Sequence, residues 1–185
     1  RPPAPNTPPP TQPIAINRAK CEETARHLVK NGTWFGPTLG APGTGNARTR
    51  TFNLAVLQMA FKAGVRLLAG TDGPGSGYWR GDYSQAGRSV QDELAGLVEA
   101  GLTPLEALKT ATVNPAILFN MTSQLGSVEA GKFADLLLLD ADPLMDIANT
   151  KRIAAVVVNG RLIDGATRQK LIDDEMAAQK ANAKP

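Results

Sequence analysis

The sequence has 185 residues, of which 42% are hydrophobic and 20% are charged, a balance typical of an ordinary globular protein. The net charge is +3, but Lys and Arg are scattered instead of forming a stripe, which argues against a nucleic-acid partner. No apolar run approaches the roughly 20 residues that cross a bilayer, so we expect no membrane partner. One cysteine, Cys21, excludes an internal disulfide and leaves the compartment and the oligomeric state open.

Residues 1–17 form a Pro-rich lead-in. Seven prolines fall within residues 1–13. Proline lacks the backbone N–H and fixes φ, so neither a helix nor a central strand is expected there. We expect this segment to be extended and disordered, and a ligand for an SH3-type domain is the alternative for such a composition.

Residues 18–30 are predicted to form a helix with one apolar face, which Asn31-Gly32 ends. His27, the only histidine of the chain, falls opposite that face. A catalytic base or a metal ligand must face a site. We therefore expect His27 to be a solvated surface side chain.

Residues 33–39 and 65–69 are predicted to form strands, with a helix between them that follows the Gly-rich loop 40–46 and ends at Gly64. A strand, a helix and a strand at this spacing indicate a βαβ unit with two parallel strands. Five residues of the helix share one face and should pack on the core: Phe52, Ala55, Val56, Met59 and Ala63.

The rest of the chain first continues with helices. Residues 90–100 are predicted to be helical, Thr103-Pro-Leu-Glu106 reads as a capping box with Pro at the first helical position, and Asn114-Pro115 opens another short helix. The pattern then changes to β: residues 133–140 form a strand and residues 155–163 a hairpin with the turn Asn159-Gly160. We expect these strands to form a small separate sheet, followed by a charged terminal helix over 166–182.

Asp72 is the candidate site residue. It follows the predicted strand 65–69 and precedes the Gly-rich loop Gly73-Pro-Gly-Ser-Gly77. The carboxyl end of a parallel strand is where α/β folds place chemistry, so Asp72 fits a metal ligand or a general base. An aspartate that caps the loop through an Asx turn fits the same position, and position alone leaves both readings open.

Other roles for this loop find less support in its residues. The loop lacks the G-x-x-x-x-G-K-[ST] and G-x-G-x-x-G patterns of phosphate-binding loops. Ser76 is not surrounded by the G-x-S-x-G pattern of a nucleophile elbow. Tyr78 and Trp79 fit the lining of a substrate pocket, or simple packing of the loop.

Several stretches together resemble the C-terminal part of the amidohydrolase family, and most of all its imidazolonepropionase-like and prolidase-like branch. The resemblance covers about residues 18–165, and the combination of A-G-L-T-P-x-E-A-L with G-K-x-A-D-L is specific. The stretches are Cys21–Leu39, Gly70-Thr-Asp-Gly-Pro74, Glu93–Ala116, Gly126–Leu144 and V156-V-V-N-G-R-L162.

The resemblance implies a fold, a reaction and a role for Asp72. The fold is a distorted (β/α)8 barrel with a small β-sandwich built from both chain ends. One or two divalent metals, usually zinc, lie at the mouth of the barrel. The aspartate that matches Asp72 contacts the metal and moves a proton from the activated water to the leaving nitrogen. Zinc lowers the pKa of its water to about 7, which makes this chemistry feasible. The implied substrate is a small-molecule amide, cyclic amide or dipeptide.

The chain is expected to be a C-terminal fragment of such an enzyme. The family pattern needs an early H-x-H, a bridging carboxylated lysine or glutamate and two further histidines, which a chain with one histidine does not supply. Two parallel strands cannot close a barrel. We therefore expect a partial barrel over 18–122, β-sandwich strands over 123–165, and a terminal helix and tail over 166–185.

The isolated chain is accordingly predicted to be inactive, to bind metal poorly and to expose apolar surface that promotes self-association. Two alternatives stay open. The chain could be a non-catalytic binding or scaffold remnant of the fold, or one half of a split enzyme whose partner chain brings the missing ligands.

Overall fold

In the computed structural model of the chain, helix α1 (Arg18–Lys30) begins where the Asn17 side chain accepts a hydrogen bond from the Lys20 backbone N–H (3.0 Å). Gly32 follows the helix with φ +61°, a conformation that glycine adopts without steric cost. These bounds confirm the predicted helix. The His27 side chain is 69% exposed, which also confirms the prediction of a solvated histidine.

The structure describes residues 13–39, 47–71 and 89–182. Several predictions concern residues outside these ranges. They are the predictions for most of the Pro-rich lead-in, for the Gly-rich loop 40–46, for Asp72, for the loop 73–77 that contains Ser76, and for Tyr78 and Trp79. Within the described ranges, no helix combines the length and the hydropathy that crossing a membrane requires.

The first sheet contains two parallel strands, β1 (Trp34–Phe35) and β2 (Arg66–Leu67), which are connected through α2 (Ala47–Lys62). The predicted parallel βαβ unit is therefore confirmed. Both strands are shorter than predicted. A strand extends only as far as a neighbour supplies ladder hydrogen bonds, and among the described residues each of the two has a single neighbour.

Helix α2 is buried on a different face from the predicted one. Its most buried side chains are Leu57 (0% exposed) and Ala60 (5%), whereas Ala63, assigned to the core face, is exposed. The helix packs against α1 and α3, so these neighbours decide which face turns inward. Helical periodicity identifies an apolar face but not the elements that will cover it.

Three helices follow: α3 (Ser89–Glu99), α4 (Pro104–Ala111) and α5 (Val113–Leu118). The predicted capping box at the start of α4 is confirmed. Helix α5 begins at Val113, and its N-cap residue Thr112 makes no side-chain capping bond. The short helix predicted at Asn114-Pro115 is therefore confirmed, but it begins one residue earlier, and the Asn114 side chain bonds to β2.

The second sheet is antiparallel and separate from the first, as predicted. Its order is β3-β4-β5, and a short 3-10 helix, η1 (Ile147–Lys151), connects β3 to β4. Helix α6 (Gly165–Asn182) follows, and the Asp164 carboxylate caps it by accepting a bond from the Thr167 N–H (2.8 Å). The strands are β3 (Leu136–Leu139), β4 (Ile153–Val158) and β5 (Arg161–Asp164).

The hairpin turn between β4 and β5 is tied to the residues just before β3. Asn159 and Gly160 both have positive φ (49° and 76°), as a two-residue hairpin turn requires. The Asn159 N–H donates to Asp135 Oδ1 (2.6 Å) and the Gly160 N–H to the Ala134 carbonyl (3.0 Å). The A-D-L and V-N-G-R-L stretches, distant in sequence, thus meet at one point.

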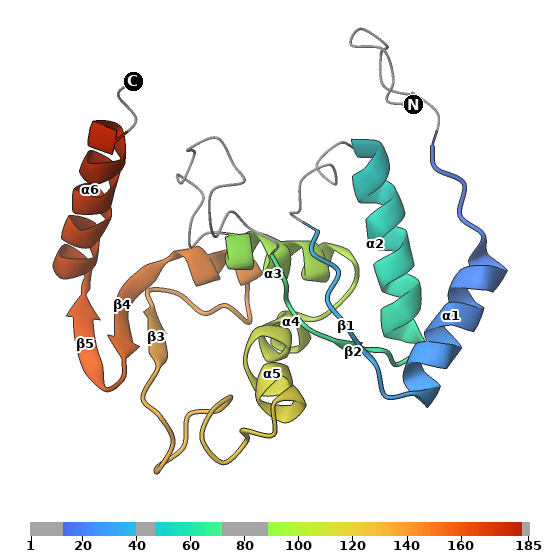
Figure 1. Ribbon diagram of the computed structural model, residues 1–185, viewed down its shortest axis with the longest axis horizontal. Coiled ribbons are helices and arrows are strands. Elements are labelled where there is room, and N and C mark those ends of the chain that lie inside the picture. The colour runs from blue at the N-terminus through green and yellow to red at the C-terminus, as the bar shows by residue number, and fades with distance from the viewer. Residues whose placement is uncertain (1–12, 40–46, 72–88, 183–185) are drawn as a thin grey trace, which may run out of the picture.

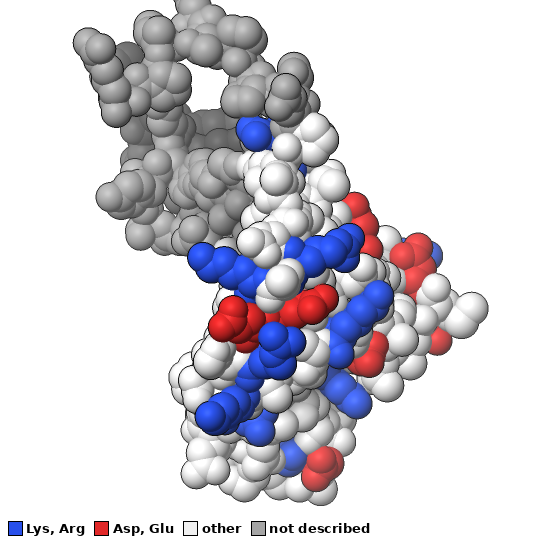
Figure 2. All heavy atoms as spheres, turned by 90° about the vertical axis from the view of Figure 1, so that its right-hand side faces the viewer, with Lys and Arg blue, Asp and Glu red and all other residues white. Residues whose placement is uncertain are grey.

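The two sheets lie on opposite sides of helices α3 to α5, with α1 and α2 at one end and α6 at the other (Figure 1). One core connects the parts: Leu57 of α2, Leu97 of α3 and Ile147 of η1 belong to the same cluster of buried side chains. An ion pair between Asp92 of α3 and Lys151 of η1 adds a second link between α3 and η1. On the face that Figure 2 presents, Lys and Arg are interspersed with Asp and Glu.

Candidate functional site

The carboxyl ends of β1 and β2 meet at one edge because the two strands are parallel. The Leu68 N–H, just after β2, donates to the Phe35 carbonyl at the end of β1 (3.0 Å). The segments 36–39 and 68–71 therefore continue side by side from this edge. Thr71 is the last described residue here, and Asp72 follows it directly in the sequence.

Helices α4 and α5 hold the segment that leads to Asp72. The Asn114 side-chain amide donates to the Leu67 carbonyl (2.8 Å), and the Ala69 N–H donates to the Thr110 carbonyl (3.1 Å). Thr110 is 2% exposed, so its contact lies inside the protein. The two bonds thus satisfy backbone groups of this segment, as burial requires.

A buried carboxylate of α3 holds the segment after β1. Glu93 is 1% exposed, and its Oε2 accepts a hydrogen bond from the Leu39 N–H (2.7 Å). Thr38, the residue before, has φ +47°, which is uncommon for a β-branched residue. The two strand ends touch at this point, since a Cβ added to Gly70 would lie 3.1 Å from Thr38 Cγ2.

The described residues do not by themselves supply a metal site. Among them, no group of three or more His, Cys, Asp or Glu side chains lies close enough together to hold a metal ion. His27 lies on the exposed side of α1, with Nε2 4.0 Å from Glu23 Oε1. A metal centre would thus need donors from outside the described ranges.

Three described carboxyl groups have a pKa below the usual range, and each belongs to a cap or a turn. The Thr103 hydroxyl lowers the pKa of Glu106, the Ser127 hydroxyl followed by Lys132 lowers that of Glu129, and the Thr167 backbone N–H lowers that of Asp164. Local hydrogen bonds explain all three shifts, so none of them indicates a catalytic acid.

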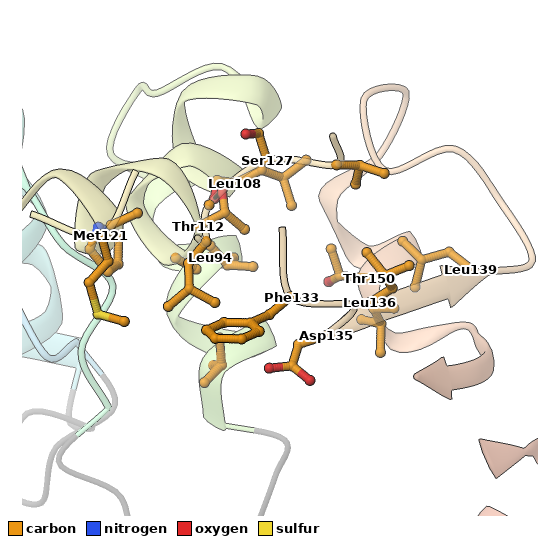
Figure 3. Close-up of a pocket in the computed structure, with 18 of the residues that line it drawn as sticks. Leu94, Leu108, Thr112, Met121, Ser127, Phe133, Asp135, Leu136, Leu139 and Thr150 are labelled. Carbon is orange, nitrogen blue, oxygen red and sulfur yellow. Dashed lines mark hydrogen bonds between the residues drawn. The ribbon is translucent and has the colours of Figure 1, made fainter. Parts of the chain in front are cut away.

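An open apolar cavity of about 680 Å³ lies between helices α3 to α5 and strand β3 (Figure 3). Leu94, Phe133 and Leu136 are among its lining side chains. Asp135 also reaches it, but the Asp135 carboxylate accepts the Asn159 N–H and serves the hairpin turn. This cavity therefore offers no second site for the chemistry that we expect at the carboxyl ends of β1 and β2.

Comparison with known families shows to which family these two strand ends and their supporting helices belong. The sequence profile described as the amidohydrolase family matches residues 23–163, which is most of the chain. The chain belongs to the amidohydrolase family. Members of this family are generally metal-dependent enzymes.

Two curated relatives of this amidohydrolase chain illustrate its place in the family. The 5-methylthioadenosine/S-adenosylhomocysteine deaminase of Thermoanaerobacter pseudethanolicus is 30% identical over 145 residues, which is 71% of this chain and 33% of the relative. The imidazolonepropionase of a Geobacillus species is 38% identical over 71 residues, 37% of this chain and 17% of the relative. The predicted resemblance to this branch is confirmed.

Solved structures show that the fold is shared. Molinate hydrolase superimposes with a TM-score of 0.59 and 30% identity, covering 83% of this chain and 36% of that chain. A Xaa-Pro dipeptidase superimposes with a TM-score of 0.59 and 24% identity, covering 77% and 37%. The amidohydrolase chain thus has part of the (β/α)8 barrel fold, and it spans about a third of the length of the deaminase, the dipeptidase and molinate hydrolase.

The sequence predicts Asp72 as a site residue, which stays a prediction, but it gives no prediction for the residues that hold the two strand ends: Thr38, Glu93 and Asn114. Glu93 could have been noticed in the sequence, because it is a charged residue on the helix face that includes Leu97 and Ala100. Both of these residues are apolar and buried. The sequence predicts Asn114 at a helix start and gives no sign of its bond to Leu67, which lies 47 residues away. The left-handed φ of Thr38 has no signal in its residue type.

Proposed function

We propose that this chain is the C-terminal part of an enzyme that hydrolyses carbon–nitrogen bonds in small molecules, with Asp72 as a catalytic carboxylate. The observation that supports the proposal is the position of Gly70-Thr71-Asp72. In a chain of the amidohydrolase family, this stretch begins three residues after the carboxyl end of the parallel strand β2, which ends at Leu67. That edge is where barrels of this kind carry their chemistry.

In the proposed reaction, Asp72 takes a proton from the attacking water and gives it to the leaving nitrogen, so that one carboxylate acts as base and then as acid. We propose zinc as the metal and Asp72 as one of its ligands. The remaining donors are proposed to come from outside the described residues, either from another part of the same polypeptide or from a partner chain. A bound divalent cation would activate water and polarise the carbonyl group of the substrate.

The proposed substrates are small amides, cyclic amides or dipeptides. Imidazolonepropionase, molinate hydrolase and Xaa-Pro dipeptidase are names of proteins to which the chain is similar, and phenylurea hydrolase B is another. These names share small organic molecules as targets. The loops at the mouth of the barrel determine which of these molecules binds.

The first prediction is that Asp72→Asn lowers turnover by about 100-fold or more, because an amide cannot carry the proton. The protein should be produced with whatever coding sequence flanks it in its gene, supplied with zinc, and assayed on a panel of dipeptides, N-acyl amino acids and cyclic ureides. The matched control is Asp174→Asn, on the exposed surface of α6, where turnover should stay unchanged.

Two results would count against this proposal. Turnover of Asp72→Asn within about threefold of the parent, the range of a harmless surface substitution, would remove Asp72 from the reaction. A folded protein that hydrolyses no member of the panel would instead favour the non-catalytic binding module.

A further inference from the structure

Glu93 is one of the largest side chains that the fold buries completely, with 1% of its surface exposed. Burying a carboxylate costs free energy unless hydrogen bonds compensate it. Its neighbours on α3, such as Leu94 and Leu97, show that an apolar residue would suit this face. The carboxylate must therefore serve a contact that an apolar side chain cannot make.

One such contact is with the backbone that leaves β1. The Leu39 N–H donates to Glu93 Oε2 over 2.7 Å, across 54 residues of sequence, and both residues are buried. A hydrogen bond to a carboxylate is shorter and stronger than one between neutral groups. Helix α3 also holds the Leu39 side chain, because a Cβ added to Gly96 would lie only 2.6 Å from Leu39 Cδ1.

The residue before Leu39 is in a strained conformation. Thr38 has φ +47°, in the left-handed region that is unfavourable for a β-branched residue. Such a conformation persists only when the surrounding contacts determine it. The bond from Glu93 fixes the peptide that follows Thr38 and so supplies one such constraint.

The strained residue faces the segment that leads to Asp72. The Thr38 methyl group would lie 3.1 Å from a Cβ on Gly70, which is closer than almost all ordinary contacts of this kind. An alanine at residue 70 would therefore require Thr38 to move by a few tenths of an ångström. By comparison, a Cβ on Gly36 would meet only the Leu68 carbonyl oxygen at 3.8 Å, an ordinary contact.

We propose that Glu93 is a positioning residue that fixes the spacing between the carboxyl ends of β1 and β2. It acts through Leu39 and Thr38 on Gly70, and thus on the backbone from which Asp72 follows. The consequence for catalysis rests on the function proposed above. The spacing itself is a property of described residues and can be tested without any activity.

The test compares Glu93→Met with Glu93→Gln. Methionine matches the length of glutamate but offers only a weak thioether acceptor, whereas the glutamine side chain retains a carbonyl oxygen for the Leu39 N–H. Backbone amide exchange is followed in segments 34–39 and 66–71, with α4 as the internal reference for global opening. Glu99→Met, on the exposed side of the same helix, is the matched control.

In Glu93→Met we expect exchange to accelerate about tenfold or more in both segments while α4 keeps its rate, and Glu93→Gln to restore the parent rates. Exchange that rises only in 34–39, in neither segment, or equally in α4 would overturn the proposal. If Glu93→Met fails to fold, Gly70→Ala against Gly36→Ala carries the test: the first should loosen both segments and the second neither.

Turnover separates this proposal from the function on which it rests. We expect Glu93→Met to lower kcat about tenfold or more, since a misplacement of about 1 Å can cost about 100-fold, with KM within about twofold and with recovery in Glu93→Gln. An effect of Asp72→Asn without any effect of Glu93→Met on kcat would overturn the positioning role alone. No effect of Asp72→Asn would overturn the proposed function, while the exchange results would still decide the spacing.

Discussion

At the start of α4, Thr103 and Glu106 satisfy each other's backbone amides. The Thr103 N–H donates to Glu106 Oε2 (2.7 Å), and the Glu106 N–H donates to Thr103 Oγ1 (3.3 Å). The Thr103 hydroxyl, then its backbone N–H, and more weakly Lys109 hold the pKa of Glu106 below its ordinary value of 4.5. The ionised carboxylate is therefore more favourable in the folded chain than in the unfolded chain.

This lowered pKa predicts a pH-dependent contribution to stability. The contribution is fully present above the unfolded value near 4.5 and is lost as the pH falls through the lowered folded value. We expect Glu106→Gln to be less stable than the parent at about pH 7, and this stability difference to be smaller at about pH 3, as measured by urea unfolding. Glu22→Gln, on the exposed side of α1, is the control, and an equal stability difference at both pH values would contradict the prediction.

Residues with local partners could be predicted and residues with distant partners could not. The capping box is visible in Thr103-Pro-Leu-Glu106 because donor and acceptor lie three positions apart. The partners of Glu93 and Asn114 lie 54 and 47 residues away. The spacing of residues along the sequence contains no information about such distant pairs. The hydrogen bonds around the candidate site therefore became visible only in the structure.

At the scale of elements, the hairpin between β4 and β5 depends on two left-handed residues in its turn. Gly160 has φ +76°, and a Cβ added there would meet nothing within 4 Å. A substitution at this position would therefore act on backbone conformation alone, without a steric clash. The turn also carries the bonds to Ala134 and Asp135, so its geometry aligns all three strands of the sheet.

We predict that Gly160→Ala destabilises the chain by about 1–2 kcal/mol, because an L-residue with a Cβ disfavours left-handed φ. Thermal or urea unfolding would measure the change. Gly36→Ala is the matched control: its Cβ has room and it lacks positive φ, so it should cost much less. Equal stability of the two variants would show that the turn relaxes to another type.

Helices and the hairpin were predictable at this scale because their signals are local. The bounds of α1 and the Asn159-Gly160 turn follow from caps and turn residues. The lengths of β1 and β2 depend on which strands lie beside them, and the inner face of α2 depends on α1 and α3. Neither dependence can be read from the segment itself.

At the scale of the whole molecule, the chain exposes large apolar side chains around the cavity of Figure 3. Phe119 is 69% exposed, Val128 82% and Phe133 56%, and all three line that cavity. Contiguous apolar surface of this kind usually marks a place where other protein packs. The chain spans about a third of the length of the deaminase and of molinate hydrolase.

We predict that the isolated chain binds a hydrophobic dye and self-associates with rising concentration, because burying this surface removes it from water. Dye fluorescence and solution scattering would measure both effects. Phe133→Gln, in the cavity, should reduce dye binding more than Met145→Gln, which is 83% exposed but lies outside the cavity. A chain that stays monomeric and does not bind the dye would contradict the prediction.

The family could be predicted from sequence because its motifs are local and specific, whereas the proposed site is spread over distant segments. Asp72 was named from its position after a strand, and its role stays a prediction, as do the domain bounds at 122 and 165. Its proposed partners in the reaction belong to no motif of this chain. Only the frame up to Thr71 is described.

The shared core has an evolutionary consequence. Ile147 of η1 is 6% exposed and lies in the same buried cluster as Leu97 of α3, and Lys151 pairs with Asp92 nearby. A genetic crossover between two relatives near residue 122 would join an α3 from one parent to an η1 from the other. Recombinants of this kind would fold only where both parents have similar side chains at the contact between α3 and η1. The two segments should therefore be inherited together.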